Sequence, residues 1–139
     1  MAGYPSTPLA RKLDIGTGHR VRSVGTPLGV DLAALLAPVP DDVDLDPDPG
    51  LVDRVLLWCD DAEQLRSRLP TALTWIPANG AVWVVWPKKS SDRWRSGPRD
   101  ITEDVVRGHA LELGVVDVKV CAVDATWSGL KLVRWLRDR

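Results

Sequence analysis

The stretch AVWVVWPKKSS, residues 81–91, decides the fold. Its first six residues are apolar on both faces of an extended chain, which is typical of a strand in the middle of a parallel sheet. Pro87 and two lysines then end the strand abruptly. Such a strand must be covered on both faces, so the stretch predicts an α/β protein with helices on each side of one sheet.

The rest of the chain alternates between strand and helix patterns. A short helix is predicted after residue 7, and further helices at 30–37, 60–73 and 100–114. Strands are predicted at 20–25, 52–59, 81–86 and 115–123, with a possible short one around 43–45 and an antiparallel partner at 130–136. This order predicts a single domain over residues 1–139. Its fold is a three-layer Rossmann-like sandwich whose mostly parallel sheet ends in an antiparallel β-hairpin. Residues 38–50, rich in proline and aspartate, are predicted as a loop.

Several residues mark where the helices begin and end. Thr7 is predicted to cap the first helix, with proline in its first turn. Pro70 is predicted to end the helix at 60–73. Asp100 and Glu103 have the spacing of a capping box at the start of the helix at 100–114.

The composition excludes several classes of function. The net charge is −1, so no field of the whole molecule attracts nucleic acid or an anionic membrane, and neither is expected as a partner. The longest apolar runs are too short to cross a bilayer, and the first residues lack the apolar core of a signal peptide. Cys59 and Cys121 fall in strand patterns, which predicts reduced core thiols in a cytoplasmic protein.

Polar residues follow the predicted strands at the edge where this kind of sheet binds ligands. Asp60 follows one of them, and the candidate ligand-binding residues are Thr26, Lys88, Lys89, Ser90, Ser91, Trp127 and Ser128. Lysine ammonium groups beside serine hydroxyls suit a phosphate or a carboxylate. The alternative is that the lysines only solvate the exit of a strand. The ring of Trp127 either covers the core as a lid or offers a stacking wall to a planar ligand ring. Trp94 either closes over the same edge of the sheet or pins its loop to a helix.

No catalytic residues and no metal site are predicted. His19 and His109 have no cysteine or acid neighbours at metal-binding spacing, although His109 and Glu112 lie one helical turn apart as a surface pair. The sequence has no GxSxG nucleophile elbow.

Four stretches carry a resemblance to a known family. They are GYPSTPLARKLDI (3–15), VWVVWPKKSS (82–91), DITEDVVR (100–107) and GVVDVKVCAVDATWSGLKLVR (114–134). They resemble a family of short bacterial proteins catalogued as a domain of unknown function. The order of elements also resembles the core of a class I methyltransferase cut to minimal length. That resemblance implies S-adenosylmethionine held by a glycine-rich turn after the first strand and by an acid after the second.

The sequence departs from that cofactor pattern. The turn after the first strand has glycines only at 25 and 29, with Pro27 between them, and the acid would be Asp44 or Asp46. We therefore predict a non-catalytic module for an anionic small molecule or a protein partner, with no cofactor. The alternatives are a degenerate or minimal S-adenosylmethionine-dependent methyltransferase, and an assembly module that uses 130–136 as an edge strand. The sequence leaves the oligomeric state open.

Overall fold

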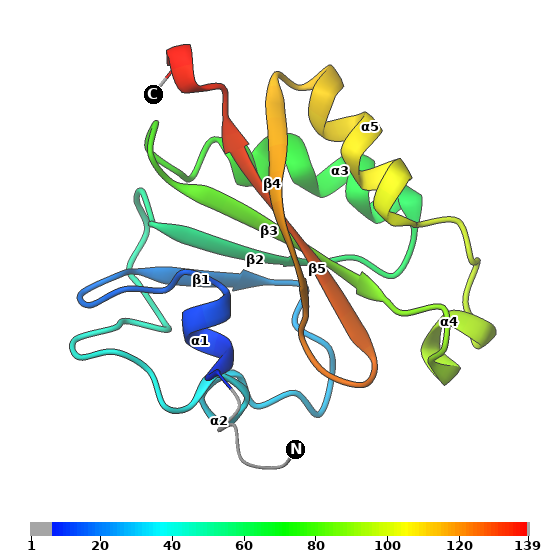
Figure 1. The fold of residues 1–139 in the computed structure, drawn as a ribbon, viewed down its shortest axis with the longest axis horizontal. Coiled ribbons are helices and arrows are strands. Elements are labelled where there is room, and N and C mark those ends of the chain that lie inside the picture. Colours follow the sequence, from blue (N-terminus) through cyan, green and yellow to red (C-terminus); the bar gives the residue numbers. More distant parts are fainter. Residues whose placement is uncertain (1–6, 139) are drawn as a thin grey trace.

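A five-stranded sheet runs through the part of the chain, residues 7–138, that the computed structural model describes. Its order is β1-β2-β3-β5-β4 (Figure 1). The strands β1, β2 and β3 pair in parallel, and β5 runs antiparallel to both of its neighbours. The predicted mostly parallel sheet with antiparallel C-terminal strands is confirmed. The strands are β1 (Val21–Val24), β2 (Arg54–Trp58), β3 (Ala81–Pro87), β4 (Val115–Ala122) and β5 (Trp127–Arg134).

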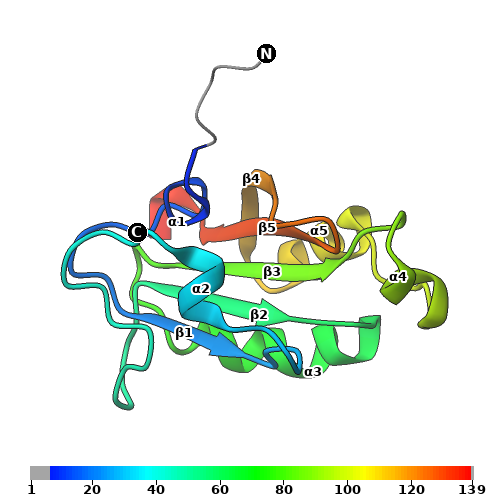
Figure 2. The same cartoon turned by 90° about the horizontal axis from the view of Figure 1, so that it is seen from below.

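Helices cover both faces of this sheet (Figures 1 and 2). The helices α3 and α5 pack on one face, and α1 and α2 pack on the other. The predicted three-layer Rossmann-like arrangement is therefore confirmed. The helices are α1 (Leu9–Lys12), α2 (Leu32–Leu36), α3 (Ala62–Leu73), α4 (Asp92–Ser96) and α5 (Glu103–Glu112), followed by a short 3-10 turn at Leu136–Asp138. None of the helices within residues 7–138 has the length and apolar character needed to cross a bilayer.

The central strand β3 is buried along its whole length, as its apolar sequence predicts. Val82, Val84 and Trp86 face α3 and α5, whereas Trp83 faces α1. The Trp83 indole is fully buried, and its Nε1 donates a hydrogen bond to the carbonyl of Leu13 at 3.0 Å. A Cβ at position 129 would lie 3.1 Å from the Trp83 ring, so glycine lets β5 approach this ring closely.

The position of β5 corrects one prediction. The C-terminal segment was expected to form an edge strand at 130–136, but β5 lies between β3 and β4 and pairs with both. The edge is β4, which carries a bulge between Asp117 and Lys119. A hairpin pattern shows that two strands pair with each other but not which of them docks on the sheet. An assembly role for residues 130–136 as a free edge is therefore wrong.

The ends of three helices differ from the predictions. Pro8, not Thr7, is the residue before α1, and no side chain caps that helix. The helix α3 continues through Pro70 to Leu73, because Leu69 and Leu73 are buried against the core and hold its last turn. Residues 92–96, expected to be a loop, form the short helix α4.

The loop at 38–50 is tied to β1. The possible strand at 43–45 is reduced to one bridge between Asp44 and Arg20. The guanidinium of Arg20 donates to the carbonyls of Asp48 and Leu51 at 2.6 and 2.9 Å. The first strand is central in a doubly wound fold. Here β1 instead forms an edge of the sheet, with this loop beside its first residues.

Candidate functional site at the carboxyl ends of the strands

The carboxyl ends of β1, β2, β3 and β4 meet at one edge of the sheet, and β5 begins there (Figure 1). The backbone N–H of Lys88 donates to the carbonyl of Thr126 at 2.7 Å, which joins the exit of β3 to the turn between β4 and β5. The structure thus brings together the loops that sequence reasoning assigned to one ligand-binding edge.

A groove of about 640 Å³ opens at this edge. We call it the rim groove. Lys88, Lys89, Ser90 and Ser128, all predicted site residues, line it. Its remaining lining residues come from β3 and from the start of α5, and they are Trp86, Thr102, Glu103 and Asp104.

The other predicted site residues do not line this groove. Ser91 is buried, and its hydroxyl caps α4 by accepting from the N–H of Trp94 at 3.1 Å. The hydroxyls of Thr26 and Ser23 share a hydrogen bond at 2.5 Å. Ser23 also accepts from the indole of Trp58, which packs on the face of the sheet opposite to Trp86. Ser91 therefore has a structural role, and Thr26 belongs to a different part of the edge.

Trp127 belongs to the core. It is 4% exposed, and its ring meets that of Trp58 edge to face with 5.1 Å between centroids. The Arg93 guanidinium covers it at 4.8 Å from the ring centroid. A ring enclosed in this way offers little open face to a ligand, which favours the interpretation of Trp127 as a cover on the core over that of a stacking wall.

An ion pair holds α4 over the exit of β2. Arg93 donates to both carboxylate oxygens of Asp60, at 2.5 and 2.9 Å. These hydrogen bonds raise the pKa of Arg93 above its ordinary value. Trp94 packs against the apolar cluster beneath α3 and α5, so it pins the segment rather than closing over the edge. Asp60 is consequently engaged within the protein and does not face the rim groove.

The charges in the rim groove are arranged unevenly. Glu103 and Asp104 both pair with Arg107, at 2.6 and 2.8 Å. Among residues 7–138 no carboxylate pairs with Lys88 or Lys89, although the Lys89 ammonium lies 5.9 Å from the centroid of the Trp94 ring. Arg107 also pairs with Asp117 at 3.1 Å, so its single positive charge offsets the acidic wall only in part. The lysine wall has no carboxylate partner in this part of the chain.

Sequence reasoning missed this acidic wall because it placed the start of α5 too early. Thr102 caps α5 by accepting from the N–H of Val105 at 3.3 Å. Asp100, predicted as that cap, instead accepts from the N–H of Ala62 at 3.0 Å. It thus adds a second acceptor at the start of α3, whose cap is Asp61. Threonine followed by two acids is itself a strong helix-start signal, and it pointed to Thr102.

The crevice between β1 and β2 is where this kind of fold holds a nucleotide-like cofactor, because α2 and α3 leave these strands toward opposite faces. Pro27, in the turn after β1, is buried. A side chain at Gly25 would clash with Nη1 of Arg68, which donates to the Trp58 carbonyl at 2.7 Å. Asp44 lies beside Arg20, at the amino end of β1. These residues do not fit S-adenosylmethionine between the two strands.

Residues 10–135 match the model of a protein family described as "Protein of unknown function (DUF3052)". The chain belongs to the DUF3052 family. A comparison of the DUF3052 chain with curated proteins by sequence gives no match.

Solved structures similar to the DUF3052 chain include several methyltransferases. The N-methyltransferase NodS from Bradyrhizobium japonicum WM9 has a TM-score of 0.58 and 14% identity, over 89% of this chain and 90% of NodS. The SAH-bound form of CalO1, a methyltransferase in calicheamicin biosynthesis, has a TM-score of 0.58 and 15% identity, over 92% of this chain and 52% of CalO1. Magnesium protoporphyrin IX methyltransferase from Synechocystis PCC 6803, with bound SAM, has a TM-score of 0.53 and 12% identity, over 91% of this chain and 74% of that enzyme. At these identities the likeness is one of fold.

Proposed function

We propose that the chain is a non-catalytic module that binds an anionic small molecule in the rim groove. The observation that carries this proposal is the pair of lysines, Lys88 and Lys89, which line the groove without a carboxylate partner among residues 7–138. The hydroxyls of Ser90 and Ser128 lie on the same groove and add neutral donors. Ammonium groups act as mobile point charges, which suits a phosphate or a carboxylate.

The chemistry of the other reactive groups supports a binding role. The imidazole of His19 accepts from the N–H of Gly16 at 2.8 Å, and His109 lies 3.7 Å from Glu112. Burial raises the pKa of the Cys59 thiol to about 12, so it is not a nucleophile at neutral pH. None of these three residues lines the rim groove. The described residues thus place neither histidine nor cysteine beside an anion in this groove.

Thermal unfolding in the presence of inorganic phosphate, citrate and adenosine monophosphate tests the proposal, with sodium chloride at matched ionic strength as the baseline. A ligand at ten times its Kd stabilises the folded state by about 1.4 kcal/mol, which raises the Tm of a domain this size by about 4 °C. We expect at least one of the anions to give such a shift in the wild type and none to do so in the variant Lys88→Ala/Lys89→Ala.

A matched control keeps the same change in net charge. Lys12→Ala/Arg66→Ala removes two exposed positive charges from α1 and α3, outside the rim groove. This control should respond to the anion as the wild type does. If all three proteins respond alike, or none responds, the anion proposal is wrong, and a protein partner becomes the better hypothesis for the groove.

A second candidate function is a minimal methyltransferase. What favours it is the fold of its structural neighbours, among them structures solved with SAH or SAM. What opposes it is the Arg68 guanidinium, which occupies the space between Gly25 at the end of β1 and the Trp58 carbonyl of β2. Calorimetric titration with S-adenosylmethionine separates the two: heat of binding at high micromolar ligand supports the methyltransferase, and its absence removes this candidate.

A further inference from the structure

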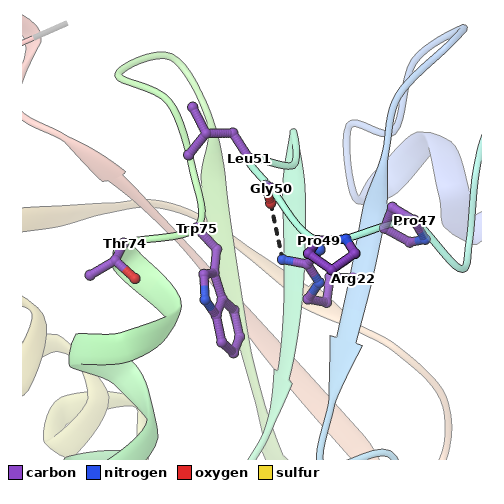
Figure 3. Close-up of a pocket in the computed structure, with 7 residues that line it drawn as sticks. All are labelled: Arg22, Pro47, Pro49, Gly50, Leu51, Thr74 and Trp75. Carbon is purple, nitrogen blue, oxygen red and sulfur yellow. Dashed lines mark hydrogen bonds between the residues drawn. The ribbon is translucent and has the colours of Figure 1, made fainter.

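A second cavity, which we call the Trp75 slot, lies at the amino ends of β1 and β2, at the opposite end of these strands from the rim groove. Its volume of about 500 Å³ falls in the range of small-molecule sites. It is lined by Arg22, Pro47, Pro49, Leu51, Thr74 and Trp75, with the backbone of residue 50 (Figure 3). Three separate segments build it: β1, the loop before β2, and the residues that follow α3.

The slot has apolar walls that face each other. Figure 3 shows the Trp75 indole on one side and Pro47, Pro49 and Arg22 on the other, with Leu51 at the top of the view. The indole is half-buried, and the Leu51 side chain is largely exposed at the mouth. Flat walls of this kind suit a planar ring, because an indole offers its face to offset stacking and a proline ring packs flat against an aromatic one.

Arg22 is the one charged side chain among the residues that line the slot. Its guanidinium lies 5.4 Å from the centroid of the Trp75 ring. It donates to the carbonyls of Gly50 at 3.1 Å and Asp48 at 2.9 Å. These bonds fix its position and use two of the five guanidinium N–H donors, and they do not neutralise its charge. Within residues 7–138, no acidic side chain forms an ion pair with Arg22.

We propose that the Trp75 slot binds a small planar aromatic carboxylate. The ring lies between Trp75 and the proline wall, and the carboxylate accepts hydrogen bonds from the free donors of Arg22. A guanidinium that is already oriented loses little side-chain freedom when it binds a carboxylate, which favours this anion over a neutral ring. The slot and the rim groove share no lining residue, so this proposal is independent of the proposed function.

Titration with naphthalene carboxylate, followed by heteronuclear NMR of the indole N–H signals, tests the proposal. The Trp75 signal is assigned as the one that disappears in Trp75→Phe. We expect a saturable shift of this signal in the wild type and an equal shift in Lys88→Ala/Lys89→Ala, because the rim groove is elsewhere. Naphthalene carboxamide, which has the same shape without the charge, should bind about tenfold more weakly.

Two variants test which residues of the Trp75 slot contribute to the binding of naphthalene carboxylate. Arg22→Gln should abolish the preference for the carboxylate over the carboxamide. Because Arg22 also holds the loop before β2, we add Thr74→Phe, which narrows the mouth from an exposed position and leaves Arg22 intact. It should weaken naphthalene carboxylate about tenfold. The proposal is overturned if the Trp75 signal shows no saturable shift, if acid and amide bind equally to the wild type, or if Thr74→Phe binds as the wild type does.

Discussion

The variant Trp127→Ala tests whether this residue belongs to the core rather than to a ligand site. The ring is 4% exposed and packs on Trp58 and Val85, with the Arg93 guanidinium over its face. Truncation of such a ring costs about 3–5 kcal/mol of the free energy of unfolding. That is a large share of the roughly 5–15 kcal/mol that a domain has in total. We expect the Tm to fall by about 10–15 °C.

Urea unfolding followed by circular dichroism measures the loss. Trp127→Phe keeps most of the packing and should cost about 1.5 kcal/mol or less. Trp94→Ala serves as a comparison, because that ring is only half-buried and should cost less than Trp127→Ala. A loss below about 0.5 kcal/mol for Trp127→Ala is what an exposed residue gives, and it would refute the burial of this ring.

Three further predictions follow from single contacts. Asp100 accepts from the N–H of Ala62 in the first turn of α3, in addition to the cap that Asp61 provides. Asp100→Ala removes this second acceptor and should cost about 1 kcal/mol in urea unfolding, whereas an Asp100 without this bond would cost almost nothing. Burial raises the pKa of Asp14, but hydrogen bonds from Lys131 and Lys119 outweigh it and leave the pKa below the ordinary 3.8. The ionised carboxylate therefore stabilises the folded state above the unfolded pKa, and this contribution is lost as the pH falls below about 4. The difference in the free energy of unfolding between wild type and Asp14→Asn should be constant at neutral pH and should shrink below about pH 4. Burial raises the pKa of the Cys59 thiol to about 12, so iodoacetamide at pH 8 should label it only after unfolding, and rapid labelling of the folded protein would contradict its burial.

The layers of the fold could be predicted because each central strand has a strong local signal. The six apolar residues of β3 admit few environments other than the middle of a covered sheet. The order of the last two strands could not be predicted in the same way. The hairpin pattern does not say which of its strands docks beside β3. In the structure β5 does so, and Gly129 meets the Trp83 ring there, which is a tertiary contact.

The candidate site was predicted in part for a similar reason. Lys88, Lys89, Ser90 and Ser128 follow or begin strands, so the rule that places ligands at strand ends brings them together. That rule fixes the edge of the sheet but not the face to which a side chain points. Thr26 lies at the correct edge on the other face of the sheet, and Trp127 lies at the correct edge but points into the core.

The most direct test of the rim groove is an NMR titration of the wild type with inorganic phosphate, observed at the backbone amides. The account predicts saturable shifts at residues 88–90, 102–104 and 128, with no comparable shifts in Lys88→Ala/Lys89→Ala. Saturable shifts that persist in this variant, or shifts confined to other parts of the chain, would contradict the claim that these lysines form an anion site.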